Sequence, residues 1–298
     1  MRPFFIILAL LPILLLPTNA LSRIKITTYN IRNFDYDSRA DIMTNKSELL
    51  KIIKSVDSDL IGVQEIVNKD AFIRFVAQYL PNYKVALTNC GGGGRQKLGF
   101  LYKSTTLKLL SFREDDTISD RKGCNSGLRP AAIGSFKHLQ TGDYFSSIVV
   151  HLKAGGRQQN ADLRYRQYGI LTQIINNIKI YENNKIVIMG DFNTTDYILR
   201  NQNYARFIDF VDHNELLDFS SEFECTSYWW GGRDDGLEYS SLLDHVLVTE
   251  DFFDSYSTYS VQLKSHCMKV SCRDAAADLL GVTYQEVSDH CPVVTSFK

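Results

Sequence analysis

The sequence predicts a layered α/β protein, and two observations support this fold class. Short apolar segments that end in polar residues recur along the chain, with amphipathic helical segments between the earlier ones. The later part of the chain is richer in strand-like segments. Elements in this order are typical of a fold in which each half of the chain supplies one sheet.

The strands are predicted where apolar residues alternate with polar ones or run continuously. Such segments occupy residues 24–30, 59–65, 99–102, 147–152, 186–191, 242–248 and 292–297. Their polar ends matter because ligands gather outside the strand ends of layered sheets, while the strand middles form core.

Helices are predicted over residues 46–56, 71–80 and 163–180. The first of them has apolar residues between Leu49 and Val56 at the spacing that gives a helix one apolar face. The clearest loops are residues 91–94 and 229–236. The glycine run 91–94 lacks the spacing of a phosphate-binding loop, so we interpret it as a surface turn.

Residues 1–20 have the pattern of a secretory signal peptide. Arg2 precedes an apolar run over residues 4–16, and small residues lead up to Ala20. The run is shorter than the roughly 18 apolar residues that a membrane span needs. We therefore expect cleavage near Ala20, no transmembrane segment, and one secreted or periplasmic catalytic domain over residues 21–298.

The composition is that of a globular enzyme, with 44% hydrophobic and 12% aromatic residues. Without Arg2 the chain has 32 basic and 34 acidic residues, so its net charge is about −2. Global charge therefore does not indicate a nucleic-acid partner. Phosphate binding would depend on a local basic surface.

Six cysteines lie in the exported part of the chain, where thiols oxidise, so up to three disulfides are expected. The pairing predicted from the sequence is Cys267 with Cys272, because a four-residue loop suits a local crosslink. A metal site that adds His266 is the rival interpretation. The absence of a Cys-x-x-Cys spacing and the oxidising compartment argue against it.

Polar groups suited to holding a hard cation and a phosphate close several of the predicted strands. Taken singly, each could be an ordinary solvated strand end, and their joint recurrence carries the signal. They are Asn30, Gln64-Glu65, His151, Asp191 with Asn193, Asp244-His245 and Ser288-Asp289-His290.

These groups belong to motifs that resemble, in order, those of the endonuclease/exonuclease/phosphatase superfamily. The resemblance covers essentially the whole mature chain. The motifs are Tyr29-Asn30-Ile31-Arg32-Asn33-Phe34, Leu60-Ile61-Gly62-Val63-Gln64-Glu65, Leu128-Arg129-Pro130-Ala131, Val150-His151-Leu152-Lys153, Met189-Gly190-Asp191-Phe192-Asn193, Leu243-Asp244-His245 and Ser288-Asp289-His290-Cys291-Pro292-Val293.

The opening and closing motifs most resemble the deoxyribonuclease I members, and residues 151–156 look like a bacterial member. The resemblance implies a four-layer sandwich, with two mixed β-sheets packed face to face and helices outside. One departure concerns the partner of His151. Where deoxyribonuclease I has a Glu, Gln96 or a neighbour is expected, and Gln cannot stabilise an imidazolium by charge.

The resemblance also implies a divalent metal, Mg²⁺ or Mn²⁺, with Ca²⁺ in a structural role. Mg²⁺ prefers oxygen ligands and is held by one or two carboxylates. Glu65 is the expected ligand, with Asn30 and Asp289 beside it. Such an ion polarises a phosphate oxygen and offsets the charge that develops in the transition state.

Proton transfer is expected from His290, whose imidazole can take a proton from water near neutral pH. Asp244 would fix its tautomer. Asp191 and Asn193 would hold the water and a phosphate oxygen in line. His151 would protonate or stabilise the leaving oxygen.

Phosphate contacts are expected from basic residues near the motifs. Arg129 would clamp the reacting phosphate through its planar fork. The residues expected on the DNA backbone are Arg32, Lys153 and Arg157, with Arg164 and Arg166 as weaker candidates because an exposed helix face carries charges without any ligand.

The predicted function is a secreted, monomeric endonuclease that cleaves DNA to 5′-phosphate ends. Three alternatives stay open. A lipid phosphodiesterase would use the same site, with Tyr228-Trp229-Trp230 as a membrane wedge, although such aromatics are as easily core. A broad RNA and DNA nuclease and a binding protein without activity are the others.

Overall fold

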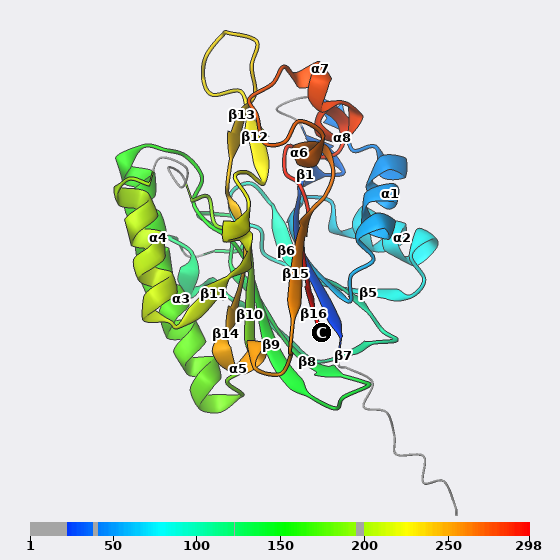
Figure 1. Ribbon diagram of the computed structural model, residues 1–298, viewed down its shortest axis with the longest axis vertical. Helices are drawn as coiled ribbons and strands as arrows, with labels where there is room; N and C mark the ends of the chain where they lie inside the picture. Colours follow the sequence, from blue (N-terminus) through cyan, green and yellow to red (C-terminus); the bar gives the residue numbers. More distant parts are fainter. Residues whose placement is uncertain (1–22, 38–40, 122, 195–199) are drawn as a thin grey trace, which may run out of the picture.

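The computed structural model describes residues 23–37, 41–121, 123–194 and 200–298. Two six-stranded sheets pack face to face, and the long helices cover their outer faces (Figure 1). The predicted α/β sandwich with two mixed sheets is therefore confirmed. The predicted signal peptide, residues 1–20, lies outside the described residues.

The first sheet is mixed, because β1 pairs parallel with β4 while its other strand pairs are antiparallel. Its strands, in spatial order, are β15 (Tyr259–Leu263), β16 (Val293–Phe297), β1 (Ile24–Phe34), β4 (Leu60–Ile66), β6 (Lys97–Lys103) and β5 (Tyr83–Leu87).

The second sheet is also mixed, with β10 parallel to β9. Its strands, in spatial order, are β11 (Leu216–Asp218), β14 (Asp244–Thr249), β10 (Ile186–Asp191), β9 (Tyr144–His151), β8 (Ala131–His138) and β7 (Leu107–Asp115). Two small ribbons accompany the large sheets: β2 (Tyr36–Asp37) with β3 (Ile42–Met43), and β12 (Ser227–Trp229) with β13 (Tyr239–Ser241).

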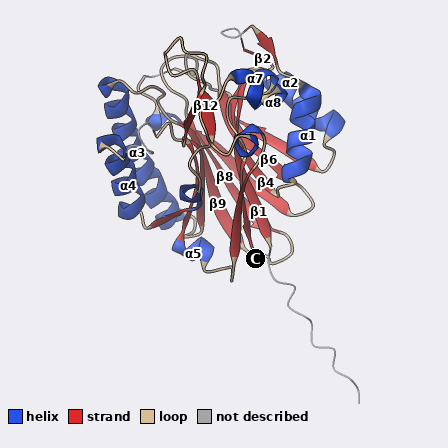
Figure 2. Cartoon of the chain, turned by 45° about the horizontal axis from the view of Figure 1, so that its top comes forward, coloured by secondary structure: helices blue, strands red, loops and turns tan. Residues whose placement is uncertain are grey.

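The helices of the two outer layers are α1 (Lys46–Val56) and α2 (Lys69–Tyr79) on the first sheet, and α3 (Gln158–Tyr181) and α4 (Gln202–His213) on the second (Figure 2). Asn45 caps α1, where its side chain accepts a hydrogen bond from the backbone N–H of Glu48. Short helices complete the chain: α5 (Glu250–Phe253), α6 (His266–Lys269), α7 (Ala277–Leu280) and α8 (Val282–Glu286). Two 3₁₀ turns occupy Asp116–Ile118 and Phe219–Glu222.

Three apolar clusters separate the four layers. The central cluster includes Phe100, Phe136 and Met189 and lies between the sheets, while the other two lie under the helices. The sheets approach so closely that a Cβ atom on Gly62 of β4 would lie 2.5 Å from Met189 Sδ. A glycine is therefore required at this point of the first sheet.

Three disulfides join the cysteines: Cys90–Cys124, Cys225–Cys272 and Cys267–Cys291. The predicted Cys267–Cys272 pairing is wrong. Cys267 lies on α6 and meets the segment that leads into β16, whereas Cys272 meets the segment before β12. The predicted number of disulfides is confirmed, and it indicates an oxidising compartment.

Removal of the Cys267–Cys291 crosslink is expected to destabilise the protein. Replacing both residues by alanine frees a loop with a sequence separation of 24 residues, which costs about 3 kcal/mol of unfolding free energy in the chain-entropy account. Calorimetry should show a melting temperature lowered by roughly 5–10 °C. An unchanged melting temperature would contradict a crosslink in the native protein.

No helix in the described part of the chain is both long enough and apolar enough to cross a membrane.

Candidate active site

The polar strand ends predicted from the sequence meet at one rim of the sandwich. In the second sheet, Asp191 at the end of β10 pairs with His151 at the end of β9 and with Asp244 at the start of β14. In the first sheet, Asn30 on β1 stands beside Gln64 of β4. The register of both sheets therefore brings residues from distant parts of the chain to one place.

His290 and Asp244 form a buried pair. The Nδ1 atom of His290 lies 2.7 Å from Asp244 Oδ2, and both residues are at least 93% buried. A carboxylate at this nitrogen fixes the tautomer, so that Nε2 is the atom directed at the site. Nε2 lies 3.7 Å from Asp191 Oδ2. The arrangement fits the roles predicted for His290 and Asp244.

Ser288 and Thr226 hold this pair in place. The Ser288 hydroxyl donates to the backbone carbonyl of Asn30 at 2.7 Å and accepts from the N–H of His290 at 3.0 Å. The Thr226 hydroxyl oxygen accepts from the N–H of Asp244 at 2.9 Å. Thr226 was not predicted from the sequence, because a lone Thr before a strand carries no recognisable pattern.

Asn30 links the acidic groups of the two sheets. Its amide nitrogen donates to Asp191 Oδ2 at 3.1 Å and to Glu65 Oε1 at 3.3 Å. Its side-chain oxygen accepts from the backbone N–H of Arg32 at 3.1 Å. Glu65 also accepts from the N–H of Asn33 at 3.0 Å. Glu65 has a positive φ of 62°, which turns the end of β4 toward the rim.

Asn193 is fixed by its own backbone. Its N–H donates to Asp191 Oδ1 at 2.9 Å, and its side-chain nitrogen donates to the carbonyl of Leu152 at 3.2 Å. A positive φ of 50° at Asn193 makes this turn directly after β10. The turn therefore joins Asn193 directly to Asp191.

His151 lies across the site from His290. Its Nε2 atom is 3.4 Å from Asp191 Oδ2 and 3.7 Å from Glu65 Oε1. Its Nδ1 atom is buried and has no hydrogen-bond partner among the described residues. The expected partner Gln96 instead donates to the side chain of Asn33 at 2.8 Å, so that expectation is wrong.

Burial and neighbouring charges shift the pKa values of these groups in different directions. Burial, followed by the Arg129 charge, holds the pKa of His151 well below its usual value. For His290, burial also opposes the charged form, but Asp244 and Asp191 outweigh it and raise the pKa well above the usual value. Burial is the main cause that raises the pKa of Asp191 to about 7 and that of Glu65 above its usual range.

The donor set fits a hard divalent cation. Asp289 is among the charges that raise the pKa of Glu65, so two carboxylates crowd this side of the rim and a cation there would relieve their repulsion. Asp191, Asp244 and His290 also form a group of possible metal ligands. Asp244 of this group is already hydrogen-bonded to His290.

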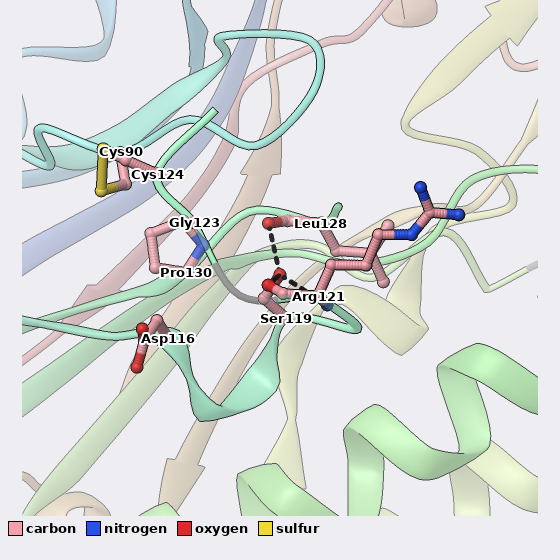
Figure 3. Close-up of a pocket in the computed structure, with 8 residues that line it drawn as sticks. All are labelled: Cys90, Asp116, Ser119, Arg121, Gly123, Cys124, Leu128 and Pro130. Atoms are coloured by element: carbon pink, nitrogen blue, oxygen red, sulfur yellow. Dashed lines mark hydrogen bonds between the residues drawn. A yellow bond between two sulfur atoms is a disulfide. The ribbon is translucent and has the colours of Figure 1, made fainter. Parts of the chain in front are cut away.

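Arg129 reaches the rim from a tightly held loop. Its guanidinium donates to the carbonyl of Leu152 at 2.6 Å, and its charge acts on both His151 and Glu65. A cavity of about 50 Å³ lies beside the loop, next to the Cys90–Cys124 disulfide (Figure 3). Its wall residue Ser119 donates to the carbonyl of Leu128, which fixes the residue before Arg129.

The other basic residues predicted at the rim differ in their availability. Lys153 is half-buried and its Nζ donates to the carbonyl of Ala154 at 2.9 Å, whereas Arg157 is exposed. Arg32 cannot serve as predicted, because its guanidinium donates to the carbonyls of Tyr284 and Gln285 in α8. Arg164 is likewise buried and structural, since it donates to the carbonyls of Lys153 and Gly155. Arg166 is exposed on α3.

His266 packs between the rings of Tyr228 and Tyr284, next to Asp289. The rival metal site does not fit, because Cys267 and Cys291 beside it are joined in a disulfide. Burial lowers the pKa of His266 to about 3. The structure therefore keeps its imidazole neutral.

The lowered pKa of His266 should make the unfolding free energy of the protein depend on pH in the acid range. Between pH 6.5 and pH 3 the unfolded chain binds a proton at His266 that the native protein does not, so the unfolding free energy should fall as the pH falls. The contribution reaches about 3 kcal/mol two pH units below 6.5. Urea unfolding of His266→Gln should be correspondingly less acid-sensitive than that of the wild type between pH 8 and 4.5. Parallel pH profiles would contradict the prediction.

The chain matches one known protein family over most of its length. The model of the Endonuclease/Exonuclease/phosphatase family matches residues 27–290. No curated protein matches the chain by sequence.

Solved structures of low sequence identity share the fold. A family protein of Bacteroides vulgatus has a TM-score of 0.64 at 18% identity, with 93% of this chain and 99% of that chain covered. The mannosyl-6-phosphatase of Bacteroides thetaiotaomicron has a TM-score of 0.60 at 17% identity, with 91% and 98% covered.

The D. rerio TDP2 complexed with single strand DNA product has a TM-score of 0.62 at 13% identity, with 93% of this chain and 99% of that chain covered. Because the family model spans the motifs from β1 to His290, this chain belongs to the endonuclease/exonuclease/phosphatase family of phosphoesterases.

Proposed function

We propose that this protein is a secreted, divalent-metal-dependent endonuclease that hydrolyses DNA phosphodiester bonds to 5′-phosphate ends. The observation that carries the proposal is the His290–Asp244 pair at 2.7 Å, which faces Asp191 and His151 across the rim. Two imidazoles on opposite sides of one acidic cluster suit an in-line displacement at phosphorus. DNA is proposed through the likeness of the opening and closing motifs to deoxyribonuclease I.

In the proposed mechanism, the neutral form of His290 takes a proton from the attacking water at Nε2 while Asp244 stabilises the imidazolium. Because the same charges raise the pKa of His290, this form gains population as the pH rises. Asp191 and Asn193 orient the water and a non-bridging oxygen. The new P–O bond forms as the bond to O3′ breaks. His151, kept neutral by burial, donates a hydrogen bond to the leaving oxygen, which takes its proton from solvent.

The remaining groups stabilise charge. Arg129 binds the scissile phosphate, and Lys153 and Arg157 contact phosphates next to it. When bound at Glu65, Asp289 and Asn30, a divalent cation supplies Lewis acidity toward a phosphate oxygen.

The test is incubation of the purified mature protein with supercoiled plasmid, with Mg²⁺ or with chelator, beside sphingomyelin vesicles and RNA. Metal-dependent nicking of the plasmid with intact vesicles is the expected result. Intact plasmid with hydrolysed lipid would replace the proposed substrate by a phospholipid, and preferential RNA cleavage would replace it by RNA.

A further inference from the structure

An exposed aromatic hairpin stands directly beside Asp289 and His290. Strand β12 ends in Trp229, which is 49% exposed, and Trp230 after it is 62% exposed. Figure 1 shows the loop between β12 and β13 rising above the ends of the large sheets. Single exposed apolar residues are common on protein surfaces, but neighbouring ones that form a patch often mark a site of interaction.

Backbone bonds attach this hairpin to the reacting groups. The N–H of Tyr228 donates to the carbonyl of Asp289 at 2.9 Å, and Ser227 forms a β-bridge with His290. Trp229 follows two residues later, at a strand rise of about 3.3 Å per residue. Its backbone therefore lies roughly 7 Å along the strand from the residue that bridges to His290.

The two faces of β12 differ, as expected for successive residues of a strand. Tyr228 is 1% exposed, and its hydroxyl donates to the carbonyl of Arg273 at 3.1 Å. Trp229 is on the opposite face and pairs in register with Tyr239 of β13. Tyr228 anchors the hairpin through its buried face. Trp229 is therefore held at the surface by an ordered strand.

The turn of the hairpin is pre-organised. The guanidinium of Arg233 lies 5.2 Å from the ring centroid of Tyr239 and donates to its hydroxyl, which in turn donates to Asp235. Gly231 has a φ of 69°, and a Cβ atom there would meet the Tyr239 ring at 2.4 Å. A fixed turn lowers the entropy lost when the hairpin binds a ligand.

The charge of the hairpin narrows the choice of ligand. Residues 229–239 contain Arg233 against Asp234, Asp235 and Glu238, so the segment is acidic. Membrane-binding segments are usually rich in Lys and Arg, so this charge disfavours a lipid surface. It also keeps a phosphate group off the turn itself, so a contact there has to come from an uncharged part of a ligand. An uncharged flat ring is the partner that two exposed indoles on an acidic turn bind best.

We propose that Trp229 and Trp230 form a stacking platform for an unpaired nucleobase next to the scissile phosphate. The inference rests on the proposed nuclease function and adds that the substrate is read in single-stranded or locally opened form. The base stacks on indole while the neighbouring phosphate occupies the rim at Arg129 and His290. Stacking on aromatic side chains tolerates any base.

Tryptophan fluorescence tests the platform directly, because Trp229 and Trp230 are the only two tryptophans of the chain. The wild-type protein in chelator, which prevents turnover, is titrated with a 12-residue oligothymidylate, an abasic strand of the same length, and phosphatidylcholine vesicles. Quenching by the oligothymidylate alone is expected. No quenching by the oligothymidylate, or a blue shift with vesicles only, would overturn the platform.

Kinetics with metal give the second readout. Trp229→Ala/Trp230→Ala should raise KM for a single-stranded oligonucleotide by about 10-fold, in line with 1–3 kcal/mol per stacked base. Trp229→Phe/Trp230→Phe should bring KM most of the way back to the wild-type value. KM for a strand that is abasic around the cleavage site should be the same for the wild type and the alanine variant. Tyr181→Ala, at an 81% exposed aromatic on α3, is the matched control.

The two proposals fail separately. If the protein nicks no plasmid but the oligothymidylate still quenches its fluorescence, the nuclease proposal is wrong and the platform stands. If the plasmid is nicked and the double Ala and double Phe variants of Trp229 and Trp230 both behave as wild type, the platform is wrong and the nuclease proposal stands.

Discussion

His290→Ala and Asp244→Asn are each expected to lower kcat/KM for phosphodiester hydrolysis by about 10³-fold, roughly 4 kcal/mol of transition-state stabilisation. The alanine variant removes the group that takes the proton from water. The asparagine variant keeps the shape of the pair, but its amide can donate to Nδ1 of His290 and so favour the wrong tautomer.

A matched control exists in the same strand. His245, next to Asp244 on β14, is buried and pairs through Nδ1 with Asp218 at 2.9 Å, so it repeats the chemistry of the catalytic pair. It faces Phe192 and Phe207 under the helices and not the rim. Asp218→Asn should therefore lower stability while kcat stays within about threefold.

Steady-state kinetics of the folded variants decide this prediction. If Asp244→Asn and Asp218→Asn lost the same activity, the loss would reflect stability, and the assigned role of Asp244 would be wrong. If His290→Ala kept wild-type turnover, the proton acceptor would have to be another group.

The sequence predicted most inner elements of the fold, although the inner strand β8 was missed. The predicted strand 186–191 coincides with β10, and the predicted helix 46–56 coincides with α1, where Asn45 supplies the cap. Inner strands are apolar on both faces, which makes their signal strong. The edge strand β7 was missed because its residues are mostly exposed or half-buried.

The part of the site that lies at strand ends could be predicted from the sequence. Asn30, Glu65, His151, Asp191 and His290 meet because the sheet register brings their strand ends together.

Contacts between segments far apart in sequence were not predictable. Arg32 was expected to bind phosphate, but the carbonyls of α8, about 250 residues away, occupy its donors. The pairing of Cys272 with Cys225 likewise depends on how α6 packs against the segment before β12, which no local spacing encodes.

Glu65→Gln is expected to weaken metal binding and to lower kcat/KM by about 10³-fold or more. The substitution keeps the size of the side chain and the oxygen that can accept from the backbone N–H of Asn33. It removes the charge that, with Asp289, would attract a divalent cation. Excess chelator should reduce wild-type activity to the level of this variant.

Metal binding can be measured apart from catalysis. A ligand at about 100 times its Kd adds about 2.7 kcal/mol to the unfolding free energy, so Mn²⁺ should raise the melting temperature of the wild type and barely change that of Glu65→Gln. Glu182→Gln is the control, because Glu182 bonds Ser135 and Ser146 and lies near Arg113, away from the rim. Full activity in chelator would exclude the metal role. If Mn²⁺ raised the melting temperatures of Glu65→Gln and Glu182→Gln equally, the metal would be bound by other ligands.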